Sequence, residues 1–502
     1  MFSSKTEVNR SFTAGRIDPR LFGSFVEHMG RVVYTGIYEK DHPTADEEGW
    51  RRDVIELTKK MGVTAARYPG GNFVSGYDWM DGIGPREKRP RKRSLAWKSI
   101  ETNEIGIDEF MHWAKKADVE PILAVNLGSK GLEEAAAFLE YCNLDPGTLY
   151  SDMRAAYASE KPYGVRIWCL GNEMDGDWQI GHKTAEEYGR IAHETGKVMK
   201  ILDPSIELVV CGSSLSSNPT VGDWDRTVIR HTFDQADYIS LHQYYGGQEK
   251  GTAAFLAQSL DLDRYIRMVT NICDAEAAMR RIEKKVMIAL DEWGVWSVPS
   301  NEVEQEVGAR PWQIAPAVGE QIYTMEDALL FASMMISMLR HADRVKIGCQ
   351  SLLTNVSACI MTEPGGDAWV QPDYHVFSMI AGSAGGAVLR EVSEEETYSA
   401  EGFSQVPLID HVCVYHEAAK ELVIYLVNRQ DRPAEAAYHF GGFNMDHVTQ
   451  SRILTSADIK NTNRKDHNLV HPEDIDNVRI QDGSVICELQ PYSFQMVRLA
   501  LA

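Results

Sequence analysis

Cysteine is scarce in the sequence, and its spacing excludes two common kinds of structural cross-link. Eight cysteines occur among 502 residues. They stand singly, at positions 142, 169, 211, 273, 349, 359, 413 and 487. A secreted disulfide scaffold carries more cysteines, and a structural zinc site takes ligands in closely spaced pairs. We therefore expect free, mostly buried thiols and no structural metal.

Long apolar runs are also missing, both at the start of the chain and within it. The first residues, MFSSKTEVNR, contain neither the apolar segment nor the small-residue cleavage site of a secretion signal. No window reaches the roughly 20 apolar residues that a membrane-spanning helix needs. These absences predict a cytoplasmic protein with no membrane partner.

Positive charge is in deficit, with 51 Lys and Arg against 73 Asp and Glu and a formal net charge of −22. Such a field repels nucleic-acid phosphates and anionic lipid surfaces. One basic run, residues 86–93, is broken by a proline and has no interleaved aromatics, so we interpret it as a solvated loop. The charge balance favours a neutral substrate and no nucleic-acid partner.

The stretch from about residue 20 to residue 380 alternates eight short apolar runs with amphipathic helical patterns. The eight candidate strands span 21–27, 64–69, 120–126, 165–173, 206–212, 238–244, 285–292 and 344–350. Because they are almost continuously apolar, they fit a parallel sheet covered on both faces. We predict a (β/α)8 TIM barrel over residues 16–380. An open doubly wound sheet is the weaker alternative, since no GxGxxG follows the first strand and no GxxxxGK[ST] occurs.

Beyond about residue 380 the helical period gives way to short alternating runs such as HVCVYHE and ELVIYLVNR. This pattern predicts a C-terminal antiparallel β-sandwich, jelly-roll-like, with its boundary in the small-residue stretch 381–387. The first fifteen residues leave no room for a helix and could add a strand. The predicted second domain therefore comprises residues 1–15 and 381–502.

Polar residues close the predicted barrel strands or lie just past them. They are Glu27, Arg67, Asn126, Asn172, Glu173, His242, Tyr244, Glu292 and Gln350. In a TIM barrel the carboxyl ends of the strands build the active site, so these side chains should meet at one mouth.

Glu173 and Glu292 are the two residues of this group that best fit catalysis. Each ends an apolar strand, and Glu292 precedes the tryptophan-containing stretch WGVW. Burying a carboxylate there costs desolvation, and glycoside cleavage requires a pair of carboxyl groups, one protonated and one ionised. Either glutamate alone could instead form a strand-end ion pair, but two of them three strands apart can address one bond from two sides.

The sequence resembles glycoside hydrolase family 51, the α-L-arabinofuranosidases of clan A, over essentially its whole length. The matching stretches are FGSFVEHMGRVVYTGIY, ARYPGGNFVSGYDWMDGIGPREKRP, WKSIETNEIGIDEF, WCLGNEMDG, LHQYYG and DEWGVW. Members of that clan carry Asn-Glu at the end of strand four and Glu at the end of strand seven, matched by Asn172-Glu173 and Glu292.

The resemblance implies a role for each site residue. Glu173 would be the acid/base and Glu292 the nucleophile, while Asn172 would bind the sugar 2-hydroxyl. Tyr244 and His242 would hold the nucleophile and keep it ionised, and Arg67 would order the carboxylates. Ring hydroxyls would be bound by Glu27, Asn72 and Gln350. Among the aromatics Trp97, Trp178, Trp296 and Trp312, we expect Trp296 to contact the sugar, because it follows Glu292 closely.

The expected activity is a retaining, exo-acting hydrolysis of terminal non-reducing α-L-arabinofuranosyl residues from arabino-oligosaccharides derived from arabinan or arabinoxylan. Retention predicts carboxyl groups about 5–5.5 Å apart. An endo-β-glucanase or β-xylosidase on the same barrel is one alternative, and a carbohydrate-binding barrel without catalysis is another. The insertion 301–313 could close the site into a pocket. We expect no cofactor and no metal, and the resemblance implies a homo-oligomer, a hexamer.

Overall fold

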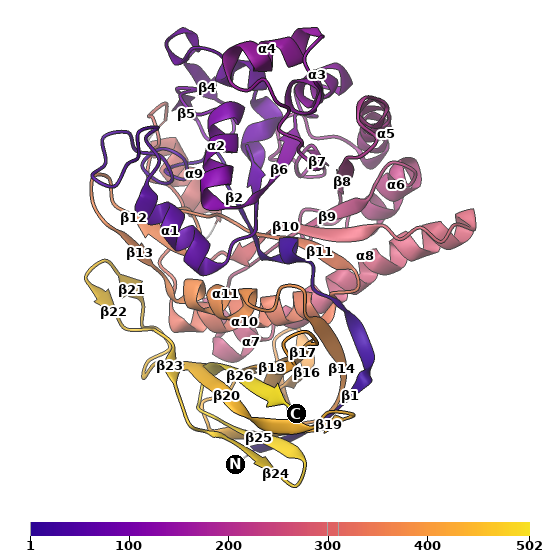
Figure 1. Ribbon diagram of the computed structural model, residues 1–502, viewed down its shortest axis with the longest axis vertical. Helices are drawn as coiled ribbons and strands as arrows, with labels where there is room; N and C mark the ends of the chain where they lie inside the picture. The colour runs from indigo at the N-terminus through magenta and orange to yellow at the C-terminus, as the bar shows by residue number, and fades with distance from the viewer. Residues whose placement is uncertain (1, 299, 310) are drawn as a thin grey trace.

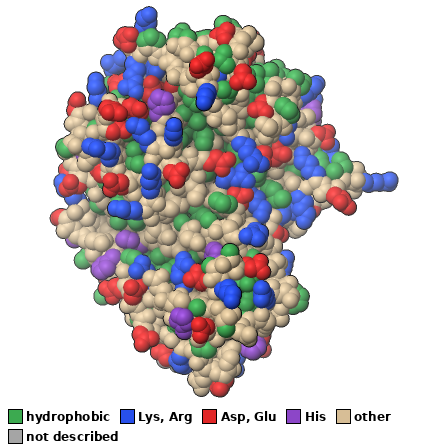
Figure 2. Space-filling model, viewed as in Figure 1, with side chains coloured by type: hydrophobic (Ala, Val, Ile, Leu, Met, Phe, Trp, Pro, Cys, Tyr) green, Lys and Arg blue, Asp and Glu red, His purple; other side chains and the backbone are tan. Residues whose placement is uncertain are grey.

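The structure is a computed structural model that describes residues 2–298, 300–309 and 311–502. Figure 1 shows an α/β body above and a β-sheet body below, with the first strand of the chain, β1, running from the lower body toward the barrel. On the face in Figure 2, acidic and basic side chains are interspersed over both bodies.

Eight parallel strands close into a barrel, as predicted. In barrel order from β2 they are β2 (Gly23–Phe25), β3 (Ala65–Tyr68), β6 (Glu120–Val125), β7 (Ile167–Leu170), β8 (Glu207–Cys211), β9 (Tyr238–Tyr245), β10 (Met287–Val295) and β11 (Val345–Gln350). Nearly every residue of these strands is buried, because side chains fill the interior and helices cover the exterior. Since β9 and β10 are longer than the others, they carry side chains past the end of the barrel.

Amphipathic helices surround the barrel. They are α1 (Arg52–Met61), α2 (Ile107–Ala117), α3 (Leu132–Asn143), α4 (Leu149–Tyr157), α5 (Ala185–Leu202), α6 (Asp223–Thr232), α7 (Thr252–Leu256), α8 (Ser259–Arg280), α9 (Ser300–Ala309), α10 (Met325–Arg340) and α11 (Pro372–Ala381). Helix α5 begins where the sequence supplies a capping box, in which Thr184 and Glu187 satisfy each other's backbone N–H. The end of α8 projects from the body (Figure 1).

Helix α10 lies between the two bodies. Every residue from Met325 to Leu339 is buried, including polar ones. A helix buried all round needs neighbours on all sides, and α10 contacts α8, α11 and β10 on one side and strands of the second sheet on the other. Helix α10 therefore forms much of the contact between the lower body and the barrel.

The lower body is one ten-stranded sheet. Its order is β23 (Glu473–Asp474), β20 (Met445–Leu454), β26 (Ser493–Leu501), β18 (Glu421–Asn428), β17 (Ile409–His416), β14 (Ala387–Glu394), β1 (Phe2–Arg16), β19 (Ala434–Gly441), β25 (Ser484–Leu489) and β24 (Val478–Gln481). The N-terminal strand β1 lies inside the sheet, antiparallel to β14 and parallel to β19. The first residues thus add a strand to the sheet that the C-terminal region forms.

The sheet curls over its own core. Side chains from both halves, such as Leu499 on β26 and Cys487 on β25, pack into one apolar cluster, and β20 contacts β24. This is how a single sheet forms a sandwich. Two-stranded sheets complete the fold: β4 (Lys92–Ser94) with β5 (Ser99–Glu101), β12 (Ile360–Thr362) with β13 (Ala368–Val370), β15 (Thr397–Ala400) with β16 (Phe403–Pro407), and β21 (Asn463–Arg464) with β22 (His467–Asn468).

From this arrangement we propose the domain division 16–380 and 1–15 with 381–502. Helix α11 ends at Ala381 and β14 begins at Ala387, so these two elements enclose the small-residue stretch 381–387 expected to contain the boundary. All eight cysteines are buried and free. None of the helices in the described part of the chain combines the length and apolar character needed to cross a lipid bilayer.

Candidate active site

Glu173 and Glu292 meet at the carboxyl end of the barrel. Glu173 follows β7, and Glu292 lies in β10, where it is paired in register with His242 of β9. One carboxylate oxygen of each glutamate and a ring nitrogen of His242 all lie within 4.8 Å of one another. The structure thus brings together the two carboxyl groups that the sequence singled out.

Arg67 and Tyr244 fix the orientation of the Glu292 carboxylate. Arg67 Nη1 donates to Oε1 at 2.7 Å, and the Tyr244 hydroxyl donates to Oε2 at 2.9 Å. The other guanidinium nitrogen, Nη2, donates to Asn172 Oδ1 at 2.7 Å. Arg67 therefore orders the nucleophile candidate and the neighbouring amide together.

The Glu173 carboxyl has two hydrogen-bond partners of different exposure. Its Oε1 lies 2.9 Å from Nδ1 of the buried His242, and its Oε2 accepts from Nε1 of Trp178 at 2.6 Å. Burial raises the pKa of Glu173, the hydrogen bond from His242 opposes this, and the charge of Glu292 raises it further. A raised pKa is what a proton donor needs near neutral pH.

His242 lies nearer to Glu173 than the resemblance implied. Its Nδ1 is 2.9 Å from Glu173 and 3.6 Å from Glu292, and its Nε2 is 3.4 Å from Asp291. Burial works against a charge on the ring, but the Glu292, Asp291 and Glu173 carboxylates outweigh it and hold the pKa of His242 well above its usual value. His242 thus links both glutamates instead of serving the nucleophile alone.

Asp291 is a part of the site to which the sequence reasoning gave no role. Its buried carboxylate lies 3.1 Å from Arg67 Nε and accepts from the Ser240 hydroxyl at 2.5 Å. Burial opposes its charge, but Arg67 and His242 prevail and lower the pKa of Asp291 to about 2. Its position directly before Glu292 on a buried strand was the signal that could have identified it.

Two of the predicted sugar-binding residues, Asn172 and Gln350, have buried polar atoms at the carboxyl end of the barrel that are unpaired in the described part of the chain. In the described structure Asn172 Nδ2 and Gln350 Oε1 are buried without a hydrogen-bond partner. Buried polar groups are normally paired, so two unpaired ones near Glu173 and Glu292 are free to bind a ligand. Asn72 is half-buried at the start of a short helix, Asn72–Gly76.

Glu27 has a different environment from the other carboxylates. It accepts from the Phe73 backbone N–H at 2.8 Å and from Trp97 Nε1 at 2.9 Å. Burial, with the charge of Glu292 added, raises the pKa of Glu27 to about 8. It therefore offers a protonated carboxyl group at neutral pH.

Trp296 borders the site at half-burial. Its ring packs edge-on against Tyr244, with the ring centroids 5.6 Å apart. Trp312 lies farther out, 37% exposed, with the guanidinium carbon of Arg93 4.7 Å from its ring centroid.

The β4–β5 hairpin forms one wall of the mouth and carries Trp97 at its turn. Of the insertion 301–313, the structure describes 301–309 and 311–313. The C-terminal end of the insertion forms backbone hydrogen bonds with the β4–β5 hairpin. The Trp312 N–H donates to the Lys98 carbonyl at 2.5 Å, and the Ile100 N–H donates to the Gln313 carbonyl at 2.9 Å. The insertion thus braces the hairpin that holds Trp97 against Glu27.

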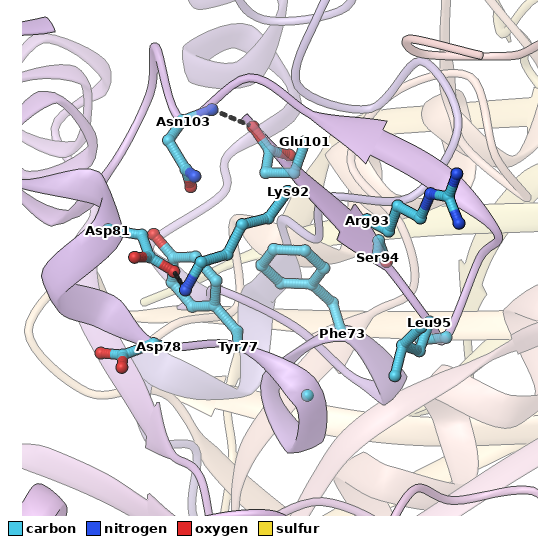
Figure 3. Close-up of a pocket in the computed structure, with 12 residues that line it drawn as sticks. Phe73, Tyr77, Asp78, Asp81, Lys92, Arg93, Ser94, Leu95, Glu101 and Asn103 are labelled. Atoms are coloured by element: carbon cyan, nitrogen blue, oxygen red, sulfur yellow. Dashed lines mark hydrogen bonds and ion pairs between the residues drawn. The ribbon is translucent and has the colours of Figure 1, made fainter. Parts of the chain in front are cut away.

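Figure 3 shows a pocket beside this hairpin, lined by Phe73 and Tyr77 on one side and hairpin residues on the other. Lys92 points across it to Asp81, 2.5 Å away. The basic run 86–93 is exposed as expected except at Arg89, whose buried guanidinium is paired with Glu109 at 2.8 Å.

Glu173, His242 and Glu292 are also close enough to bind one cation together, since their ligand atoms lie within 4.8 Å of one another. A cation there would displace the His242 hydrogen bond to Glu173 and keep both carboxylates ionised, leaving no proton for a leaving group. We assign the three residues to acid–base chemistry, and the expectation of no metal stays a prediction.

Comparison with known proteins gave consistent matches. Residues 57–261 match the family model described as α-L-arabinofuranosidase 1 domain, and residues 291–493 match α-L-arabinofuranosidase C-terminal domain. The chain is 46% identical to the intracellular exo-α-(1→5)-L-arabinofuranosidase 1 of Bacillus subtilis, over 99% of both chains. It is 43% identical to the exo-α-(1→6)-L-arabinofuranosidase of Bifidobacterium longum, over 99% of this chain and 97% of that one.

A solved structure is also similar over nearly the whole chain. A family 51 α-L-arabinofuranosidase from Bifidobacterium longum superposes with a TM-score of 0.94 at 39% identity, covering 99% of this chain and 100% of that one. The barrel, the curled sheet and their connection are therefore shared with this relative.

Proposed function

Because the chain belongs to the α-L-arabinofuranosidases of glycoside hydrolase family 51, we propose that it removes terminal non-reducing α-L-arabinofuranosyl residues from arabino-oligosaccharides by double displacement. Glu292 is the nucleophile and Glu173 the acid/base in this proposal. The observation that carries it is the pair of carboxyl groups within 4.8 Å of each other, in environments that differ in hydrogen bonding and charge.

In the first step a Glu292 oxygen attacks the anomeric carbon, while Glu173 gives its proton to the departing glycosidic oxygen. The spacing supports a direct attack, because an inverting pair stands about 6.5–9.5 Å apart to admit a water molecule. Arg67 and Tyr244 hold the attacking carboxylate in place. The products are an alcohol and a covalent arabinosyl-enzyme.

In the second step Glu173, now ionised, takes a proton from water, and the water oxygen displaces Glu292 from the anomeric carbon. Arabinose leaves with its original configuration, and Glu173 has its proton back. Covalent bond formation removes the negative charge of Glu292, one of the causes that raise the pKa of Glu173, so the proton affinity of Glu173 falls when it must act as a base.

Substrate contacts are proposed for the free polar atoms of the mouth. Asn172 Nδ2 would donate to the sugar 2-hydroxyl, a bond that strengthens in the transition state of glycosidases. Glu27, Asn72 and Gln350 would bind the remaining hydroxyls, with Trp296 against the ring.

The relatives' names also bear on cellular location and on the glycosidic linkage. Several carry the word intracellular in their names, in agreement with the cytoplasmic location expected from the sequence. Their names include both (1→5) and (1→6) linkages, so both arabinobiosides belong in the assay. The homohexamer implied by the resemblance stays a prediction for light scattering.

The test is hydrolysis of nitrophenyl α-L-arabinofuranoside beside the β-D-xyloside and β-D-cellobioside, by the wild type, Glu173→Ala and Glu292→Ala, with and without azide. We expect arabinofuranoside-selective activity that both substitutions abolish or strongly reduce. Azide should give a product of retained configuration with Glu173→Ala, where it replaces water, and of inverted configuration with Glu292→Ala, where it replaces the nucleophile.

Other outcomes are equally informative. Cleavage of the xyloside or cellobioside in place of the arabinofuranoside would refute the substrate while leaving the carboxylate roles in place. Exchange of the two azide products would reverse those roles.

A further inference from the structure

The acid/base carboxyl is held from two sides, one buried and one open to solvent. His242 approaches Oε1 from inside the barrel, whereas Trp178 approaches Oε2 with an indole that is 46% exposed. The Nε1–Oε2 distance of 2.6 Å places the two side chains in direct hydrogen-bond contact.

Gly176 leaves room for the Trp178 indole. A Cβ on Gly176 would lie 2.4 Å from Cε2 and 2.5 Å from Cζ2 of Trp178, so the ring lies directly on the glycine Cα. The φ angle of Gly176 is outside the left-handed region, so what this position requires is space. An alanine there would push the rigid indole away while keeping its N–H.

The turn that carries Trp178 is itself braced. The Gly176 N–H donates to the Glu173 carbonyl at 2.9 Å. Asp175 accepts from the Ser214 backbone N–H at 3.0 Å and from Asn218 Nδ2 at 2.7 Å, which ties this turn to the loop after β8. The indole is therefore presented to Glu173 from a fixed base.

We propose that Trp178 is a positioning residue for Glu173: its indole N–H holds Oε2 in the direction of the leaving group and favours the ionised carboxylate over the protonated acid. The proposal rests on the proposed function, in which Glu173 is the acid/base. Because an indole only donates, it cannot accept the Glu173 proton and compete with the leaving group for it.

The charged groups around Glu173 set the direction of the effect. His242 faces it from β9 and Glu292 from β10, with the Tyr244 hydroxyl on Glu292. Burial and the Glu292 charge favour the proton, whereas the donors His242 and Trp178 disfavour it. Removal of the Trp178 donor should therefore make Glu173 hold its proton to higher pH and donate it less readily.

Two variants disrupt the hydrogen bond from Trp178 to Glu173 in different ways. Trp178→Phe keeps an aromatic ring and removes the donor, and Gly176→Ala keeps the donor and displaces the ring. Trp369→Phe is the matched control, since Trp369 lies on β13 and its Nε1 has no hydrogen-bond partner among the described residues. The measurements are kcat/KM against pH, and kcat for aryl arabinofuranosides with a good and a poor leaving group.

We expect both variants to move the basic limb of the profile up by about 0.5–1 pH unit. The poor leaving group should lose roughly 10-fold in kcat, part of the ~10²–10⁴-fold that general acid catalysis contributes, and the good one much less. Trp369→Phe should match the wild type in both readouts, and melting temperatures should confirm that all variants fold.

An unmoved limb and an unchanged leaving-group ratio in Trp178→Phe would overturn the proposal. A shift in Gly176→Ala alone would assign the effect to ring packing and would also overturn it. A wild type inactive on every arabinofuranoside would instead refute the proposed function.

Discussion

At the scale of single residues, the site is a balance of charges in a small buried volume. Arg67 and His242 are its cations, and the carboxylates of Asp291 and Glu292, the proposed nucleophile, lie against them. The remaining carboxyl groups, Glu27 and Glu173, both have raised pKa values because burial and the charge of Glu292 disfavour further negative charge. Because the two cations already face Asp291 and Glu292, burial and the charge of Glu292 raise the pKa of both remaining carboxyl groups.

The first prediction concerns the acid stability given by Asp291. Its folded-state pKa of about 2 lies below the ordinary value, so its contribution of about 2 kcal/mol is present above pH 4 and is lost as pH falls toward 2. Asp291→Asn should therefore be less stable than the wild type at pH 5–7, with the difference shrinking below pH 4. Urea unfolding across this range measures it.

The control for Asp291 is Asp446→Asn, at an exposed position on β20. Its unfolding midpoint should match the wild type at every pH. A difference between Asp291→Asn and the wild type that stays constant from pH 6 to pH 2 would contradict the linkage argument.

The second prediction concerns the pH dependence of activity. Since Glu173 must be protonated in the first step and its pKa is raised, kcat/KM should fall on the basic side at a pH above the ordinary glutamate value. Glu27 has a pKa of about 8 and could shape the same limb. Glu27→Gln, which mimics the protonated form, should retain the limb if Glu173 causes it.

The sequence singled out the two glutamates that the structure brings together, but not some of their closest contacts. Glu173 and Glu292 were identifiable because strand ends are fixed by the apolar pattern, and the barrel brings those ends together. The bond from Trp178 to Glu173 depends on how the loop after β7 turns, and the choice of His242 between two glutamates depends on side-chain conformation. Neither is encoded in a local pattern.

At the scale of elements, β1 shows that a strand can be predicted from its local pattern while the strands it pairs with cannot. Burial alternates from Ser4 to Val8, as expected of a strand with one face on a core. The pattern predicts a strand in the sandwich. Its antiparallel pairing with β14 and parallel pairing with β19 could not be predicted, because any compatible edge satisfies the same alternation.

The third prediction tests the central position of β1. Val8 is 2% exposed in the apolar core of the sheet. Val8→Asp should destabilise the protein by more than about 3 kcal/mol, because it buries an unpaired charge. Chemical unfolding followed by circular dichroism measures the change.

Glu7→Gln is the matched control, one residue away on the exposed face of β1. Its unfolding should be unchanged within about 0.5 kcal/mol. Equal effects of the two substitutions would mean that β1 does not face the core as described.

At the scale of the whole molecule, a buried ion pair joins the two bodies beside α10. Arg429 of the sheet body donates to Asp410 at 2.6 Å and to the Ser259 hydroxyl of α8 at 2.7 Å. Arg340, at the end of α10, donates to the other Asp410 oxygen at 2.8 Å. One aspartate thus balances guanidinium groups from both bodies.

The fourth prediction is that Asp410→Ala loosens this junction. It leaves the Arg429 guanidinium buried without its counter-charge, which costs about 3–5 kcal/mol. Calorimetry should show a lower melting temperature or a separate transition for the sheet body. Arg432→Ala, which breaks an exposed pair with Glu396, should leave the melting curve unchanged.

The place of β1 inside the sheet also has a consequence for synthesis on the ribosome. Val8 pairs with Glu391 and Phe440, which are made 383 and 432 residues later. At roughly 5–20 residues per second, about 20–90 s pass between the emergence of this strand and that of its neighbours. The barrel can close during that time, whereas β1 waits with both edges unpaired, so the earliest segment of the chain is among the last to find its place and the one a chaperone would have longest to bind.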